Sequence, residues 1–319
     1  MTRQSLEKNQ VLIYLTAILG GLGIGAAVPE SGAIFEAMLW PVLALLLYVT
    51  FTQVPLLHLW VALVDARFLA AAVFGNFAVL PVIVWSLMIL APGDPAIRLG
   101  VAMVLLVPCT DWFITFTQLG GGDTAGAIAF TPISLLLQII LLPAYLWIFF
   151  GEAFTVALAR GEILTAFVVL ILMPLLAAFL TEKWLERGTG RSPLLTRLAC
   201  LPVPLLAFVV FIIAAAQVNI AMSSGALLGR LLVLFAAFLV IAAAIAHVLG
   251  KLFKLPAKQG RVLAFSLGTR NSFVVLPLAL ALPASFELAV VVIVFQSLVE
   301  LFGMVAYLWW VPRKLFPTQ

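Results

Sequence analysis

The chain has 319 residues, of which 65% are hydrophobic and 9% are charged, and its formal net charge is +4. About a quarter of the residues of a soluble globular protein are charged, so this composition excludes a water-soluble fold. The basic residues lie in short connections between apolar segments, which indicates anchoring to a lipid bilayer, and no nucleic-acid partner is predicted. Cys109 and Cys200 both lie in apolar sequence, so neither a disulfide framework nor a metal site is predicted.

Apolar runs separated by Pro, Gly and charged residues predict ten membrane-spanning helices. The predicted spans are 11–28, 34–54, 69–90, 99–118, 124–149, 163–180, 198–217, 228–250, 262–282 and 287–311. The first follows a polar N-terminus and opens a series of similar segments, so we expect a span there and not a signal peptide. The predicted fold class is therefore an all-α polytopic membrane protein.

Lys and Arg residues are unequally distributed between the two sides of the predicted membrane. With the N-terminus inside, the inner segments contain 13 of the 17 basic residues, whereas the outer segments contain Arg98, Arg160 and Arg230. Cytoplasmic loops carry such an excess. We therefore expect both termini in the cytoplasm and the chain in the cell inner (cytoplasmic) membrane. The remaining basic residue, Arg270, lies within the ninth span.

An internal repeat appears at a nearly constant offset. The sequence Pro-Val-Leu-Ala-Leu at 41–45 resembles Pro-Leu-Leu-Ala-Phe at 204–208, and Ala-Tyr-Leu-Trp at 144–147 recurs at 306–309. These matches predict two five-helix repeats, over residues 1–155 and 156–319. An odd number of spans in each repeat would invert the second in the membrane, which is an architecture of secondary transporters.

The offset of 162 residues aligns two segments, each of which is expected to interrupt its helix. It pairs Pro108 with Arg270, Cys109 with Asn271 and Thr110 with Ser272. Proline removes a backbone donor in the fourth span, and Gly268 relaxes the helix in the ninth. Two breaks at corresponding positions predict a substrate site there. The predicted substrate-binding residues are Cys109, Thr110, Arg270, Asn271 and Ser272.

Charged side chains within the spans are candidate coupling groups. Asp111 and Arg270 each cost about 2.5–3.5 kcal/mol to insert, so we expect them to face the protein interior and one another. This pair could be a structural ion pair, or a switch that releases Arg270 when Asp111 is protonated. Glu300, which the offset pairs with Gln138, is a candidate proton carrier that could share hydrogen bonds with Gln296 one turn earlier. Alternatively, Glu300 only bonds neighbouring backbone.

These features resemble the bile acid/arsenite/riboflavin transporter superfamily, and most of all its arsenite-efflux permease branch. The resemblance covers nearly the whole chain and includes Pro-Cys-Thr at 108–110, Leu-Gly-Gly-Gly-Asp at 119–123, Arg-Asn-Ser-Phe at 270–273 and Glu300. It implies that spans 1, 2, 6 and 7 form a panel and the other six a core with crossed, broken fourth and ninth helices. It also implies that Cys109 and Glu300 are functional residues.

The chain departs from both branches in the ninth span. The arsenite branch typically has Asn-Asn-Phe-Glu where this chain has Asn-Ser-Phe-Val at 271–274. The bile-acid branch typically has a sodium-ligating glutamate and a Gln-Asn pair where this chain has Ser266 and Arg270. A guanidinium would repel a sodium ion in such a poorly screened place, so sodium coupling is not expected.

The function that the resemblance implies is proton-coupled export of arsenite or a similar small solute, without a cofactor. The alternative is a carrier of a small organic anion related to the bile acid:sodium symporters, with Arg270 as the counter-charge. An intramembrane enzyme is not expected, because His58 and His247 lack the spacing of a metalloprotease motif and no acid pair stands at helical spacing. A channel is a third possibility. The oligomeric state is not predicted.

Overall fold

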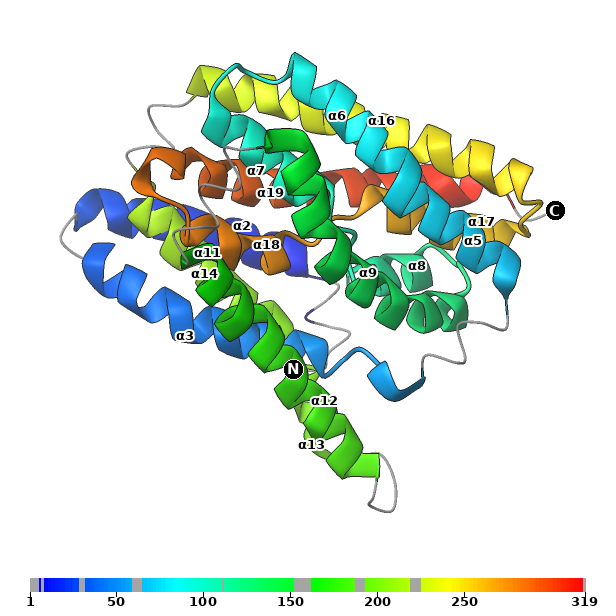
Figure 1. The fold of residues 1–319 in the computed structure, drawn as a ribbon, viewed down its shortest axis with the longest axis horizontal. Helices are drawn as coiled ribbons and strands as arrows, with labels where there is room; N and C mark the ends of the chain where they lie inside the picture. The colour runs from blue at the N-terminus through cyan, green and yellow to red at the C-terminus, as the bar shows by residue number, and fades with distance from the viewer. Residues whose placement is uncertain are drawn as a thin grey trace. The chain divides into compact units, whose positions relative to one another are not determined.

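The computed structural model describes residues 6, 9–28, 32–58, 65–110, 112–151, 162–186, 193–218 and 225–317. Within this part the regular structure is helical, and the only β pairing is one isolated bridge (Figure 1). The helices are α2 (Gln10–Ala27), α3 (Gly32–Phe51), α5 (Ala66–Phe74), α6 (Leu80–Leu90), α7 (Pro95–Leu105), α8 (Trp112–Leu119), α9 (Thr124–Phe150), α11 (Glu162–Ala166), α12 (Met173–Glu186), α13 (Pro193–Leu198), α14 (Pro202–Ala216), α16 (Gly225–Leu252), α17 (Ala257–Gly268), α18 (Ser272–Leu280) and α19 (Leu288–Trp310).

Several of these helices are long and apolar enough to cross a bilayer. In the described ranges there are five, at Ala66–Leu90, Thr124–Phe150, Leu164–Leu185, Gly225–Leu252 and Ala284–Leu315. Shorter apolar helices cover Leu12–Ala27, Ala37–Phe51, Pro95–Leu105 and Pro202–Ala216. The chain is therefore an all-α multi-pass membrane protein, as its composition predicts. The exact number of ten spans stays a prediction.

Three segments of the described part of the chain have π-helical hydrogen bonding, which the sequence did not indicate. They are η3 (Gly75–Val79) between α5 and α6, η4 (Phe167–Leu172) between α11 and α12, and η6 (Val311–Leu315) after α19. Such insertions are often found at functional sites because they re-aim the side chains around them. The first of them contains Asn76, a buried polar residue.

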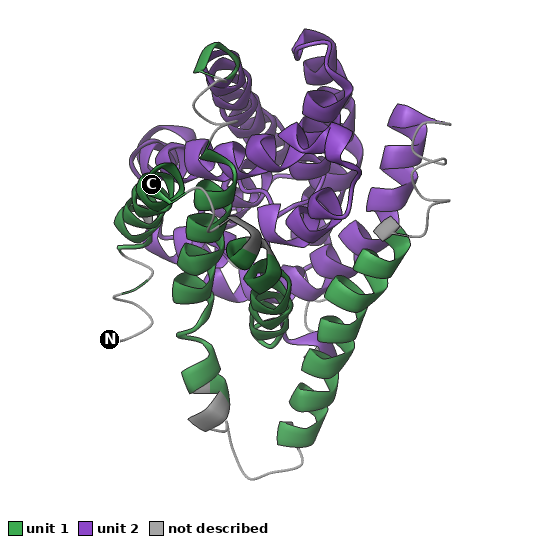
Figure 2. Cartoon of the chain, turned by 90° about the vertical axis from the view of Figure 1, so that its left-hand side faces the viewer, with its two compact units in different colours: residues 1–53, 162–227 green, residues 54–161, 228–319 purple. Residues whose placement is uncertain are grey.

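The chain divides into two compact units (Figure 2). Unit 1 comprises residues 1–53 and 162–227, and it holds the segments expected as spans 1, 2, 6 and 7. Unit 2 comprises residues 54–161 and 228–319, and it holds the other six. This division has the same membership as the panel and core that the family resemblance implies.

In unit 1, α2 packs closely against α14 because glycines line one face of α2. A Cβ atom at Gly21 would overlap the carbonyl oxygen of Phe211, and one at Gly25 would overlap that of Ala215. Small residues four apart allow membrane helices to approach in this way. A Cβ atom at Gly23 would meet no neighbouring atom of the described residues within 4 Å, so Gly23 faces away from this contact.

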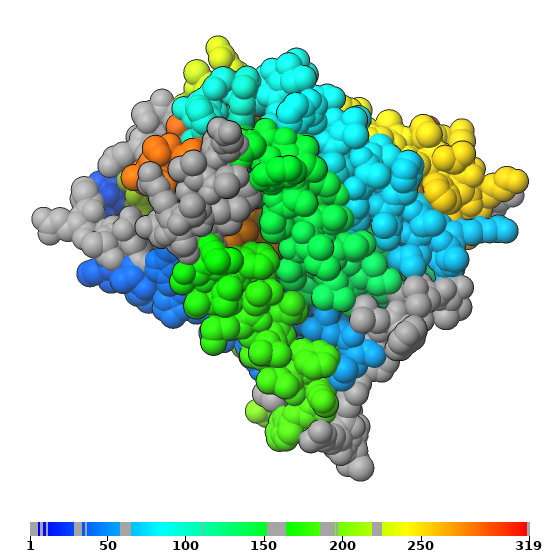
Figure 3. Space-filling view, in the orientation of Figure 1, coloured from blue at the N-terminus to red at the C-terminus, as the bar shows by residue number. Residues whose placement is uncertain are grey.

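In unit 2, α6 and α9 lie side by side, and Figure 3 shows them on one face of the molecule. The rings of Trp85 and Phe149 meet there, with centroids 4.9 Å apart. Large apolar side chains project from the same two helices, including Ile89 at 69% exposure and Ile140 at 67%. Such a surface is stable against lipid rather than water.

Two tyrosines in unit 2 make equivalent hydrogen bonds. The Tyr145 hydroxyl donates to the carbonyl oxygen of Phe77 at 2.5 Å, and the Tyr307 hydroxyl donates to that of Leu239. Donor and acceptor are 68 residues apart in both cases, and each residue of the first pair lies 162 before its counterpart. This is the offset at which the sequence repeats.

We predict that Gly25→Ala lowers the thermal stability of the purified protein, because the added methyl group would force α2 away from α14. Overpacking of this kind costs about 1–3 kcal/mol. Gly23→Ala is the matched control, and it should leave the melting temperature unchanged or raise it slightly, because alanine is the better helix former. Equal melting temperatures for the two variants would contradict the proposed contact.

Candidate functional site

Two interrupted helices of unit 2 pair with one another through their backbones. The stretch between α7 and α8 meets the stretch between α17 and α18 in an antiparallel bridge between Pro108 and Arg270. The N–H of Asn271 donates to Val107 at 2.8 Å, and the N–H of Cys109 donates to Thr269 at 3.2 Å. Unpaired backbone groups are costly in a bilayer, and here two N–H groups of the breaks bond carbonyls of the opposite break. The predicted breaks in the two helices are confirmed. Pro108 and Arg270, which the sequence offset aligned as equivalent positions, are in addition found in direct backbone contact.

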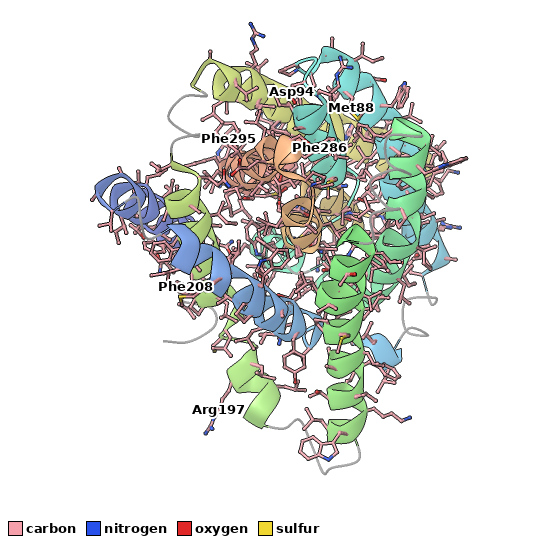
Figure 4. All side chains as sticks on the ribbon, turned by 60° about the vertical axis from the view of Figure 1, so that its left-hand side comes forward. Met88, Asp94, Arg197, Phe208, Phe286 and Phe295 are labelled. Atoms are coloured by element: carbon pink, nitrogen blue, oxygen red, sulfur yellow. The ribbon has the colours of Figure 1, made fainter. Side chains whose placement is uncertain are left out.

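Side chains cap the first N–H groups of two helices that flank the breaks, α7 and α18. Asp94, labelled in Figure 4, precedes α7, and its Oδ1 accepts the N–H of Ala96 at 2.8 Å. Asn271 precedes α18, and its Oδ1 accepts the N–H of Val274 at 3.3 Å. Side-chain oxygens at this position satisfy donors that have no partner within the helix.

The Arg270 side chain is enclosed by protein oxygens. It is 2% exposed, and its Nη2 donates to Asn76 Oδ1 at 3.0 Å and to the carbonyls of Ser266 and Leu267 at 2.8 and 2.9 Å. Its Nη1 donates to the carbonyl of Leu105 at 3.3 Å. These three carbonyls stand at the C-terminal ends of α7 and α17, where a cation is favoured by the helix dipoles.

Glu300 on α19 contacts the backbone of the second break directly. It is 1% exposed, and its Oε2 accepts the N–H of Arg270 at 2.8 Å and the Nε2–H of Gln296 at 2.8 Å. Gln296 Oε1 in turn accepts the hydroxyl of Ser272 at 3.1 Å. The expectation that Gln296 shares hydrogen bonds with Glu300 is confirmed. A continuous polar network therefore runs from Ser272 to the break.

Other predicted site residues gather at the first break. Asn271 Nδ2 donates to Thr110 Oγ1 at 3.1 Å, which links the two interrupted helices through side chains as well. Cys109 is buried beside them. Asp111 lies outside the described residues, so its contact with Arg270 stays a prediction.

Asn76 is a site residue that the sequence analysis missed. Its Oδ1 accepts from Arg270, and its Nδ2 donates to Ala72 and to Ser266 Oγ, each at 3.0 Å. The sequence feature that could have indicated this role is that Asn76 is a lone amide side chain within the apolar predicted span 69–90. The π-helical turn of η3, which holds Asn76, could not be foreseen from that signal because it depends on tertiary contacts.

The side chains of Gln138 and Ser134, one turn apart on α9, are buried. Neither side chain has a hydrogen-bond partner in the part of the chain that the structure describes. The repeat offset gives a reason. It pairs Gln138 with Glu300, which bonds the N–H of Arg270, and it pairs Arg270 with Pro108, which has no N–H. Pro108 therefore offers no backbone donor at the position that the offset aligns with Arg270.

The described residues contain no group of three or more His, Cys, Asp or Glu side chains that could hold a metal ion. The site instead consists of neutral polar groups, one guanidinium and one carboxylate around two unwound helix segments. Interrupted helices that meet inside a multi-pass helical protein are the arrangement found at the substrate sites of many transporters.

The comparisons with known proteins agree with this class. The model of the sodium bile acid symporter family matches residues 40–224, which is more than half of the chain, so the chain belongs to that family. Members of this family are membrane transporters of small solutes, in keeping with the expectation that the chain is not an enzyme. No curated protein matches the chain.

We predict that Asn271→Ala lowers the free energy of unfolding by about 1 kcal/mol more than Asn271→Ser does. Both variants lose the amide bond to Thr110, but serine can still cap α18 whereas alanine cannot. The measurement is thermal unfolding of the detergent-solubilised protein, with Thr110→Ser as a control that retains a hydroxyl. Equal losses for the two Asn271 variants would show that the cap is unimportant.

Proposed function

We propose that this protein is a proton-coupled secondary transporter that exports arsenite or a similar small solute, with Glu300 as the proton carrier. The observation that carries the proposal is the position of Glu300. It is the only buried carboxylate in the described part of the chain, and it accepts the N–H of Arg270 within the break. A proton there would change both the charge and the hydrogen bonding of the unwound segment.

Protonation of Glu300 acts on the site through its neighbours. The ionised carboxylate accepts bonds from Arg270 and Gln296 on the same oxygen. The protonated acid is a weaker acceptor and no longer balances the charge of Arg270. Both changes loosen the network that ends at Ser272, so proton binding and solute binding would affect one another reciprocally.

The architecture we propose is two inverted five-helix repeats, over residues 1–155 and 156–319. The equivalent hydrogen bonds of Tyr145 and Tyr307 and the pairing of Pro108 with Arg270 support it. In such folds the site stands at the membrane midplane, and transport moves one helix group past the other. The distribution of Lys and Arg supports cytoplasmic termini in the inner membrane.

The solute would contact Cys109, Thr110, Asn271 and Ser272. The buried charges of the described residues at the breaks are one guanidinium and one carboxylate, which balance, so this environment suits an uncharged solute. A thiol is a soft ligand, which suits a soft element such as trivalent arsenic. The unbonded amide of Gln138 and hydroxyl of Ser134 are further candidate contacts.

The second candidate function is transport of a small organic anion. The family match supports it equally, because the family takes its name from bile acids. In this mechanism Arg270 is the counter-charge and a substrate contact. Its Nη groups already donate to protein oxygens, while its Nε has no hydrogen-bond partner among the described residues.

We predict that Glu300→Gln reduces proton-driven flux by about tenfold or more while the protein still folds, because an amide cannot carry a proton. The measurement is solute uptake into inverted membrane vesicles with an imposed pH gradient. Glu287→Gln is the matched control, since it makes the same change at the exposed start of α19, and its flux should remain normal.

Unchanged flux with unchanged pH dependence in Glu300→Gln would remove Glu300 from the mechanism. The same vesicles separate the two candidate solutes. Saturable movement of arsenite supports the first proposal, and movement of a small carboxylate without arsenite flux supports the second. Flux that neither saturates nor exchanges would indicate a channel instead.

A further inference from the structure

Three oxygen atoms converge on a single nitrogen of Arg270. Nη2 lies 3.0 Å from Asn76 Oδ1, 2.8 Å from the carbonyl oxygen of Ser266 and 2.9 Å from that of Leu267. The carbonyl oxygen of Leu105 approaches the neighbouring Nη1 at 3.3 Å. All four acceptors are uncharged, and they come from three different segments of unit 2. We call this set of four oxygens the oxygen cradle.

The oxygen cradle has the composition of a site for a small hard cation. Hard cations select carbonyl, amide and carboxylate oxygens. In secondary transporters, the C-terminal ends of half-helices and unwound carbonyls coordinate sodium. Leu105 is the last residue of α7, and Ser266 and Leu267 stand in the last turn of α17. The partial negative charges of two helix C-termini therefore both lie at the oxygen cradle.

A sodium ion does not fit this cradle beside the guanidinium. Nη2 already stands where the oxygens converge, and a second positive charge next to it would be repelled in a buried, poorly screened site. The chain nevertheless belongs to a family named for sodium symport. The residues present in the oxygen cradle of this chain therefore do not fit the sodium ion for which the family is named.

We infer that the Arg270 guanidinium is a tethered substitute for an alkali cation in the oxygen cradle. Because the charge is covalently fixed, it is present at every step and cannot be exchanged for an ion from solution. The protein therefore requires no sodium at this position, and removing the guanidinium should create a sodium site. This inference rests on the contacts of Arg270 and does not depend on a proton at Glu300.

A second buried arginine on α17 shows that the cradle is not a general property of buried arginines. Arg261 donates from Nε to Phe316 at 3.0 Å and from Nη1 to Gly121 at 2.9 Å. Its longer bonds reach Gly120 at 3.4 Å and Pro312 at 3.5 Å. The acceptors of Arg261 are spread over three nitrogens, whereas three of the four acceptors of Arg270 share one nitrogen, so Arg261 provides a matched control.

The experiment compares melting temperatures of the purified protein in NaCl, KCl and choline chloride at equal ionic strength. The wild-type protein should melt at one temperature in all three salts. Arg270→Ala should be less stable in choline and should regain about 3 °C or more with sodium in a saturable manner, as a ligand that binds only the folded state requires. Arg261→Ala should be destabilised equally in every salt.

If the alanine variant does not fold, Arg270→Gln is a smaller change that also removes the positive charge and should also respond to sodium. Arg270→Lys keeps a cation, so its melting temperature should stay insensitive to sodium. Adding Asn76→Leu to Arg270→Ala should weaken the sodium response, because it removes one oxygen of the cradle. The inference is overturned if the wild-type protein is itself stabilised specifically by sodium, or if both Arg270→Ala and Arg270→Gln melt identically in all salts.

These measurements separate this inference from the proposed function. Loss of proton-driven flux in Glu300→Gln tests the proton carrier and leaves the salt comparison unaffected. A sodium response that appears in Arg270→Ala supports the tethered cation even if Glu300 proves unnecessary for transport.

Discussion

The pairing of two broken helices is the interaction on which unit 2 depends. A helix that unwinds inside a membrane leaves backbone donors and acceptors without water to satisfy them. In this protein the two unwound stretches satisfy each other, through the bridge between Pro108 and Arg270 and the bonds of Cys109 and Asn271. The bond between Asn271 and Thr110 then fixes the two breaks relative to one another. The side chain of Glu300 satisfies a further donor of the second break, the N–H of Arg270.

Charge at the breaks follows from the same geometry. The ends of α7 and α17 converge, so their last carbonyls create a negative region that a cation must neutralise. Arg270 supplies that cation from within the chain, and Glu300 bonds the backbone of the same residue. One positive and one negative side chain thereby act on a single unwound segment. Hydrogen bonds connect this segment through Glu300 and Gln296 to Ser272.

The sequence predicted the parts of the fold that depend on local composition and on repetition. Apolar runs located the helices, and Pro108 and Gly268 located the breaks. The 162-residue offset aligned Pro108 with Arg270, but their direct contact is a finding of the structure. The spacing of Gln296 and Glu300 foresaw their hydrogen bond, because residues four apart share a helix face. The sequence did not reveal Asn76, because nothing local indicates the π-helical turn that holds it.

By itself, the sequence determined that this is a helical membrane protein with two interrupted helices, because lipid solubility and helix interruption are properties of short segments. Only the tertiary structure decided what the buried charges do. Arg270 is bonded to Asn76 and to the carbonyl ends of two helices, partners that stand up to 194 residues away. Which acceptors reach a guanidinium depends on how distant helix ends converge, and no local pattern in the chain encodes that convergence.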